Sequence, residues 1–270
     1  MADSSRLTAI CADLAAEHED LDALVSDLPG AAFDRASPAP GWSIRDQISH
    51  LAWFDERALE AVTSPEEFRA GAEALLADFP AAMDRPAEIG RAMTQPAVLA
   101  WWRGRRTALL AGLAEMDPEA RLPWYGPDMG AVSFVTARLM ETWAHGQDVA
   151  DALGTTRPPT VRLRHVAHIG VAAMAFSFRI HGLPPPVQPV RVELSGPHDE
   201  AWAWGALGAS NLVRGDALEF CLVVTQRRHL DDVRLRLEGP VAEQWMGIAQ
   251  AFAGPPGEGR RPGQFAREGG

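Results

Sequence analysis

The sequence predicts an α+β protein in which a four-helix bundle is followed by a small mixed domain. Apolar residues recur at helical intervals in four long segments of the first half of the chain. A short stretch with two prolines and no apolar pattern follows at 155–159, and short strand-like runs come after it. We therefore expect a helical bundle over residues 1–155, a small α+β domain over 156–253 and a disordered tail over 254–270.

Local signals mark where the helices of the bundle start or stop. Ser43 and Asp46 form a capping-box pattern that starts the second helix, and Gly154 ends the fourth. We expect the segment 63–96 to be irregular and the Pro- and Gly-rich segment 123–130 to be a loop. The four predicted helices are Arg6–Leu28, Ser43–Val62, Ala97–Met116 and Val132–Leu153.

The second half of the chain mixes two kinds of pattern. Helical periodicity comes first, then short runs with alternating apolar residues that are typical of strands, then a final helical segment. The run Ala217–Thr225 fits a helix or a strand equally well. The other predicted elements are a helix at Arg162–His181, strands at Val190–Leu194, Ala201–Trp204 and Val233–Leu237, and a helix at Val241–Phe252.

The composition narrows the class of function. The formal net charge of -11 argues against binding to nucleic acid, which requires a basic surface, so we expect small-molecule partners and a monomer or a homodimer. No apolar run reaches the roughly 20 residues that a bilayer requires, so no contact with a membrane is expected. The N-terminus lacks a signal-peptide pattern, and the two cysteines, Cys11 and Cys221, suit a reducing compartment. We therefore expect a cytoplasmic protein.

A candidate metal site begins with Glu141 and His145. These residues are four positions apart in a predicted helix, so their side chains leave the same face one turn apart. His50, on another predicted helix, would add a second imidazole and give a three-ligand site with open positions. The alternative is an ordinary solvated helix face. Asp148, one turn after His145, could orient that imidazole or replace it as a ligand.

Other candidate residues lie outside this set. Trp124 and Tyr125 precede the fourth predicted helix and are expected at the rim of the site, where they would contact a cofactor, although core filling explains Trp124 equally well. Arg227 and Arg228 follow an apolar run, a position from which guanidinium groups could hold a substrate carboxylate; solvated charge is the alternative. His18, flanked by acidic residues, is expected to be solvated.

The segments that carry the metal-site residues resemble a known family. Gly41-Trp-Ser-Ile-Arg-Asp-Gln-Ile-Ser-His50-Leu and Glu141-Thr-Trp-Ala-His145-Gly-Gln-Asp148 are similar to the DinB-like metal-binding bundles, and within them to the mycothiol-dependent maleylpyruvate isomerase group. The resemblance implies a divalent metal, usually zinc, on His50, Glu141 and His145. It also implies that the second domain is sterol-carrier-like and that one of its arginines, Arg227 or Arg228, serves the active site.

These observations lead to one main hypothesis and two alternatives. The main hypothesis is an isomerase or S-transferase in which a bound divalent metal lowers the pKa of a low-molecular-weight thiol such as mycothiol, which acts on a small anionic substrate. The first alternative is an Fe(II) oxygenase, which uses the same two-His-one-carboxylate ligands. The second is a binding module without catalysis, in which the metal is structural and the second domain holds an apolar ligand.

Overall fold

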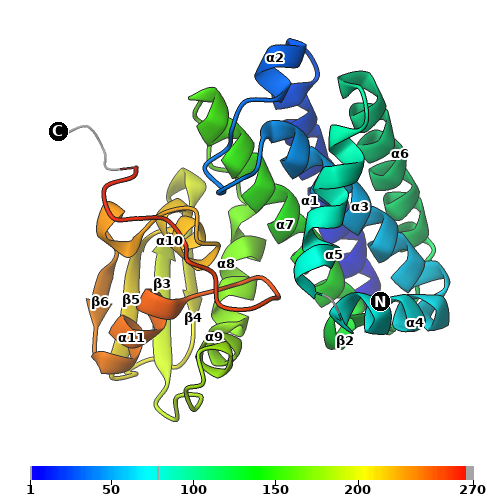
Figure 1. The fold of residues 1–270 in the computed structure, drawn as a ribbon. Helices are drawn as coiled ribbons and strands as arrows, with labels where there is room; N and C mark the ends of the chain where they lie inside the picture. Colours follow the sequence, from blue (N-terminus) through cyan, green and yellow to red (C-terminus); the bar gives the residue numbers. More distant parts are fainter. Residues whose placement is uncertain (1, 78, 266–270) are drawn as a thin grey trace. The chain divides into compact units, whose positions relative to one another are not determined.

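The computed structural model describes residues 2–77 and 79–265 and confirms the α+β class (Figure 1). The chain divides between Arg157 and Pro158 into two compact units. The first is helical with one small hairpin, and the second contains a four-stranded sheet with helices. No helix among the described residues is long and apolar enough to cross a membrane. Cys11 and Cys221 are both free thiols.

The first unit is a bundle with its long helices α1, α3, α6 and α7 at the positions predicted for four helices. Helix α3 packs against α5, α6 and α7, and α1 packs against α7. The bounds of the elements in this unit are α1 (Ala2–Val25), α2 (Gly30–Phe33), α3 (Ile44–Thr63), α4 (Pro65–Ala77), α5 (Phe79–Arg91), α6 (Gln95–Ala114), β1 (Arg121–Trp124), β2 (Gly126–Gly130) and α7 (Ala131–Leu153).

Local signals explain where α3 starts and α7 ends. The Ser43 hydroxyl accepts a hydrogen bond from the backbone of Asp46, and the Asp46 carboxylate accepts one from the Ser43 backbone at 2.8 Å, so the capping box is confirmed. Gly154 follows α7 with φ of +67°, a left-handed conformation that a residue with a Cβ adopts only at a cost.

Two predictions about the connecting segments are wrong. The segment 63–96 is largely helical, as α4 and α5, and these two helices bury Phe68, Ala72 and Ala87. The segment 123–130 lies in the β1–β2 hairpin, in which Pro123 falls at an irregularity of the strand pairing, where its missing N–H interrupts no regular ladder bond.

The bundle core lies mainly among α1, α3, α6 and α7. Trp102 of α6 is fully buried and is the largest side chain in it. Burial of this apolar surface fixes the helices that carry the candidate site. The core cluster consists of Leu21, Val25, Phe33, Ile44, Ile48, Leu51, Ala52, Val98, Leu99, Trp102 and Val149.

The second unit is built on a sheet with the strand order β4-β3-β5-β6. Strand β3 is antiparallel to β4 and parallel to β5, and β5 is antiparallel to β6. Helix α10 contacts strands β3 and β5, and helix α11 contacts strands β5 and β6. The bounds are α8 (Leu163–Ala172), α9 (Met174–Ile180), β3 (Val190–Ser195), η1 (Pro197–Asp199), β4 (Ala201–Trp204), β5 (Asn211–Asp216), α10 (Ala217–Val224), η2 (Leu230–Asp232), β6 (Arg236–Glu238) and α11 (Pro240–Ile248).

The second unit departs from the sequence predictions at several places. The helix predicted for 162–181 is interrupted at Ala173. The residue at the break is an alanine, not the glycine or proline that would indicate a helix end from the sequence. The strand predicted for 233–237 is confined to β6, and α11 ends before Ala249, whose backbone is extended. Strand β5 was not predicted, because it contains Gly215 and Asp216, residues that are rare in strands.

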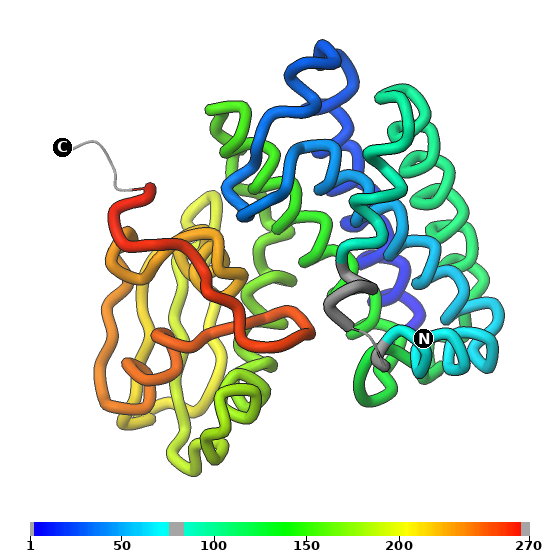
Figure 2. Tube along the Cα trace, viewed as in Figure 1, coloured from blue at the N-terminus to red at the C-terminus, as the bar shows by residue number. Residues whose placement is uncertain are grey.

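The segment after α11 has no helix or strand among its described residues, yet it is bonded to the rest of its unit. Figure 2 shows it as the red part of the tube. The Gly257 N–H donates to the Gln250 side chain at 3.0 Å, and the Gly263 N–H donates to Asp232 at 2.7 Å. The tail was predicted to be disordered over 254–270, of which residues 266–270 lie outside the described part.

Candidate functional site

Three predicted ligands lie together between helices α3 and α7. His50 comes from α3, and Glu141 and His145 come from α7, one turn apart. One potential ligand atom from each lies within 4.8 Å of the other two. The Glu141 Oε2 atom is 3.2 Å from Nε2 of His145 and 3.9 Å from Nε2 of His50. Because Glu141 and His145 are one helical turn apart, both side chains leave α7 on the face that lies towards His50 of α3.

The geometry and the donor chemistry fit a divalent metal ion. Ligand atoms at about 2.1 Å from a tetrahedral ion lie roughly 3.4 Å apart, and the two separations from Glu141 fall on either side of that value. Two imidazole nitrogens and one carboxylate oxygen suit zinc and other first-row metals. Three protein ligands leave room for a further ligand in a four-coordinate site.

Aromatic side chains surround the two imidazoles. The Trp42 ring is stacked on His145 with centroids 6.0 Å apart and lies 5.1 Å from the His50 ring. Phe54, one turn after His50, packs on it at 4.4 Å. The exposed fractions of the His50, His145 and Glu141 side chains are 13%, 10% and 22%. The site is therefore largely screened from water, which strengthens charge interactions inside it.

Charge favours the ionised form of Glu141. Burial acts to raise its pKa, but the hydrogen bond with His145 and the electrostatic effect of His145, His50 and Arg138 outweigh burial and lower the pKa to about 2. Arg138 lies one turn before Glu141 and pairs with the buried Asp55 of α3 at 2.9 Å. A carboxylate that stays ionised at neutral pH is the form that binds a metal.

Gln47 bonds to Nδ1 of His145, whereas the other ring nitrogen, Nε2, faces Glu141. The Gln47 Oε1 atom lies 2.5 Å from His145 Nδ1, and the Gln47 Nε2 atom donates to the Ser37 hydroxyl at 2.9 Å. Asp148 is buried on α7 but is not part of the ligand cluster. Sequence reasoning missed Gln47, although its position three residues before His50 places it on the same helix face.

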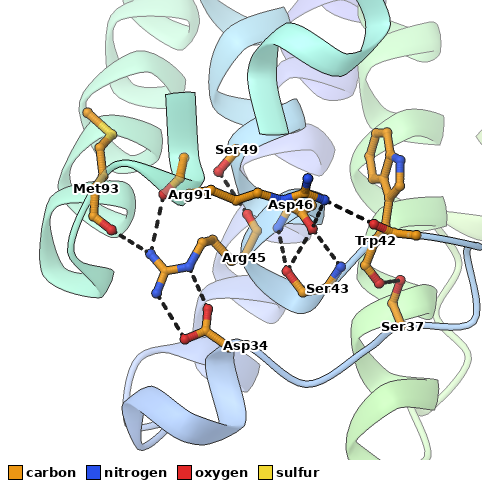
Figure 3. A network of polar contacts seen from close by, with 11 residues as sticks. Asp34, Ser37, Trp42, Ser43, Arg45, Asp46, Ser49, Arg91 and Met93 are labelled. Carbon is orange, nitrogen blue, oxygen red and sulfur yellow. Dashed lines mark hydrogen bonds and ion pairs between the residues drawn. The ribbon is translucent and has the colours of Figure 1, made fainter. Parts of the chain in front are cut away.

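The loop before α3 is held by paired charges (Figure 3). Arg91 of α5 donates to Asp46 at 2.9 Å and to the Gly41 carbonyl at 3.0 Å. Arg45 donates to Asp34 at 2.6 Å. These four charged side chains line an open hollow of about 510 Å³, whose lining also includes Trp42. Because the two guanidinium groups already face two carboxylates, the hollow has no net charge from these residues, and its contacts fix the loop.

Trp124 and Tyr125 lie in an aromatic cluster that reaches the candidate ligands. Trp124 ends β1 and is stacked on Phe68 of α4 with centroids 5.4 Å apart. Tyr125 contacts Phe54 edge-on at 5.9 Å, and Phe54 in turn packs on His50. Burial raises the pKa of Tyr125, so its hydroxyl stays protonated. Both residues are half-buried, and contact with a cofactor stays a prediction.

Arg227 and Arg228 lie in the second unit, directly after α10. The turn passes through Gln226, whose φ of +60° is unusual for a residue with a side chain. The backbone N–H groups of both arginines then donate to the Leu222 carbonyl, at 2.7 and 3.1 Å. The Arg228 guanidinium lies over the Phe265 ring at 3.9 Å. Both side chains are half-buried, and a role in substrate binding stays a prediction.

His18 is buried, so the expectation of a solvated residue is wrong. Its side chain is 1% exposed, and its Nε2 atom lies 3.9 Å from the Asp55 carboxylate. Burial, together with the charges of Arg106 and Arg138, lowers its pKa to about 3. The neighbouring acidic residues suggested solvent, but contacts from α3 and α6 cover the imidazole.

The comparisons with known proteins place the chain in a family. The family model described as "Mycothiol maleylpyruvate isomerase N-terminal domain" matches residues 14–150, which include the three candidate ligands. The chain belongs to this family. The predicted resemblance to the mycothiol-dependent maleylpyruvate isomerase group is thereby confirmed. Family membership alone does not show which atoms bind a metal, so the ligand set stays a prediction.

Relatives extend the similarity beyond the family domain. Two proteins of Mycobacterium tuberculosis, from strains CDC 1551 and H37Rv and each called "Uncharacterized protein", are 47% identical over 249 residues, which is 92% of this chain and 97% of theirs. The crystal structure of the mycothiol-dependent maleylpyruvate isomerase matches with a TM-score of 0.58 at 15% identity, over 87% of this chain and 95% of that chain. A histidine-to-alanine mutant of that enzyme matches with a TM-score of 0.57 at 15% identity, over 82% and 90%. At this identity the two structures show a shared fold.

Proposed function

We propose that this protein is a metal- and thiol-dependent isomerase or S-transferase. His50, Glu141 and His145 hold a divalent metal ion, with zinc the first candidate. Mycothiol is the proposed thiol cosubstrate, and the substrate is a small anionic molecule. The observation that carries the proposal is the convergence of these three side chains, within 4.8 Å, in a chain of the mycothiol maleylpyruvate isomerase family.

The metal would supply a Lewis acid that lowers the pKa of a bound thiol, so that a thiolate is available at neutral pH. The protein's own residues prepare that position. Glu141 stays ionised because its pKa is about 2. Trp42 and Phe54 cover the imidazoles and limit the access of water, which would compete with the thiol for the open position.

A thiolate can isomerise a conjugated cis alkene without a net change of atoms. It adds to one carbon of the double bond, rotation follows about the resulting single bond, and the same carbon–sulfur bond breaks to release the trans alkene and the thiolate. Arg227 and Arg228 are proposed to hold a carboxylate of such a substrate, since guanidinium groups bind carboxylates in a bidentate manner. Trp124 and Tyr125 are proposed to contact the body of the thiol.

The test is thiol binding to the metal-loaded protein. Wild type and His145→Ala are loaded with Co²⁺, and mycothiol is added while the visible absorption and the thermal midpoint are recorded. We expect a new sulfur-to-metal charge-transfer band and a raised midpoint only for wild type, because a ligand that binds the folded state stabilises it. Isomerisation of maleylpyruvate with mycothiol is then followed by ultraviolet absorption. If metal-loaded wild type shows no new band and no shift of the thermal midpoint, thiol dependence is contradicted.

The ligand set also favours a second candidate function. Two imidazoles and one carboxylate form the usual Fe(II) site of oxygenases, so the same residues could serve dioxygen chemistry. Oxygen uptake by the iron-loaded protein, absent from Glu141→Gln, would support this function over the thiol-dependent one. A bound metal that changes with neither thiol nor dioxygen would instead indicate a binding module in which the metal is structural.

A further inference from the structure

Gln47 connects the loop before α3 to one of the candidate metal ligands. It lies on α3 three residues before His50, and its side chain is fully buried. Its Oε1 atom is 2.5 Å from Nδ1 of His145, while Nε2 of the same imidazole faces Glu141 at 3.2 Å. The two ring nitrogens therefore have different partners, one outside the ligand cluster and one within it.

The hydrogen bonds determine which way the Gln47 amide points. The Ser37 hydroxyl donates to the Trp42 carbonyl at 2.9 Å (Figure 3), so its single proton is already used. The Ser37 oxygen, 2.9 Å from Gln47 Nε2, must then accept, and only the NH₂ end of the amide can donate to it. The carbonyl end of Gln47 consequently faces His145.

The orientation of Gln47 fixes the tautomer of His145. An amide oxygen only accepts hydrogen bonds, so His145 Nδ1 must carry a proton. Nε2, the nitrogen that faces Glu141, is then the one from which a metal ion displaces the shared proton, and its lone pair is directed into the ligand cluster when the metal is bound. Without Gln47, the neutral imidazole could place its proton on either nitrogen, and only one of the two tautomers could bind through Nε2.

The loop keeps Ser37 in the position that this chain of hydrogen bonds requires. The backbone N–H of Ser37 also donates to the Trp42 carbonyl at 2.7 Å, and Ala36 forms a β-bridge with Ser43. Trp42, in the same loop, is stacked on the His145 ring. The loop therefore contacts His145 in two ways, through its face and through Gln47.

We propose that Gln47 is a positioning residue, oriented by Ser37, that sets metal affinity by holding His145 in the Nδ1–H tautomer. This inference rests on the metal site of the proposed function. It predicts that Gln47→Leu, which removes the acceptor at similar volume, weakens Zn²⁺ binding by about 10- to 100-fold. Gln47→Glu keeps an acceptor and should stay within a few-fold of wild type. Ser37→Ala should have a smaller effect than Gln47→Leu.

Two measurements test the inference. Zn²⁺ affinity is measured by chelator competition, and the presence of a proton on His145 Nδ1 is read from the ¹⁵N chemical shifts of the imidazole in the metal-free protein, assigned with His145→Gln. Gln147→Leu is the matched control, since Gln147 is a buried glutamine of α7 whose amide bonds to Asp151 at 2.8 Å instead of to a candidate ligand. Circular dichroism checks that every variant folds.

The outcomes separate the inference from the proposed function. A loss of affinity and of the Nδ1–H tautomer in Gln47→Leu, with Gln47→Glu and Gln147→Leu near wild type, supports the inference. Equal Zn²⁺ affinity and an unchanged tautomer in Gln47→Leu overturn it, as does an equal loss in Gln147→Leu. If wild type binds no divalent metal, the proposed function fails, while the metal-free tautomer still tests whether Gln47 orients His145.

Discussion

Asp55 and Arg138 form a buried ion pair between the two helices that supply the candidate ligands. Asp55 follows His50 on α3, and Arg138 precedes Glu141 on α7; their nearest atoms are 2.9 Å apart. The side chains are 0% and 3% exposed. Burial raises the pKa of Asp55, and the Arg138 guanidinium opposes that shift. Replacing Asp55 by Asn therefore leaves a guanidinium buried without its negative partner.

The expected cost follows from that uncompensated charge. Removing one member of a buried pair costs about 3–5 kcal/mol, a large part of the roughly 5–15 kcal/mol that stabilises a typical domain. Asp55→Leu combined with Arg138→Met removes both charges and should destabilise far less than the sum of the two single changes. Urea unfolding of the full chain, followed by circular dichroism and tryptophan fluorescence, gives the free energy of unfolding for each variant.

A surface pair on the same bundle is the control. Arg69 of α4 donates to Asp128 at 2.8 Å, but the Arg69 side chain is 45% exposed. Asp128→Asn should leave the urea midpoint unchanged, because solvent screens such pairs. A loss of less than about 1 kcal/mol in Asp55→Asn, or strict additivity in the double variant, would refute the assignment of a coupled buried pair.

Three further predictions concern packing, pH and backbone conformation. Gly90→Ala should destabilise the protein by about 1–3 kcal/mol, because the new Cβ would lie 1.8 Å from the Ser49 hydroxyl oxygen and force α5 away from α3; urea unfolding measures this, and Ser49→Gly in the same chain should restore part of the loss. His18 has its pKa lowered to about 3 by burial, so the unfolded chain takes up a proton that the folded chain does not. The free energy of unfolding should fall as the pH drops from about 6.5 towards 3, by at most about 1.4 kcal/mol per pH unit. Its slope against pH should be larger in wild type than in His18→Gln. Equal slopes would show that His18 is solvated. Gly154→Ala should cost about 1–2 kcal/mol, since φ at Gly154 is +67°, and an unchanged thermal midpoint would count against the left-handed turn.

The features that sequence reasoning predicted well are those encoded in local signals. Ser43 and Asp46 are close enough in sequence to form a capping box whatever the rest of the chain does. The long helices have apolar residues at helical intervals. The pairing of Glu141 with His145 on one face follows from helix geometry alone. The helical bundle of the first unit and the presence of strands in the second unit could therefore be predicted from the sequence.

The features that were missed depend on contacts between distant segments. Strand β5 contains Gly215 and Asp216, and it is a strand because β3 and β6 pair with it on both sides. His18 is buried because side chains of α3 and α6 cover it, which its acidic sequence neighbours do not indicate. Gln47 lies in the segment that carried the family resemblance, yet its bond to His145 links positions 98 residues apart.

The metal content of the purified protein tests the central claim most directly. Wild type, His50→Ala and His145→Ala are purified without added metal or chelator, checked for folding by circular dichroism, and analysed for all first-row metals by elemental mass spectrometry. The account predicts about one divalent ion per wild-type chain, with zinc expected, and little metal in either folded variant. Folded variants that retain as much metal as wild type would contradict the assignment of His50, Glu141 and His145 as the ligands.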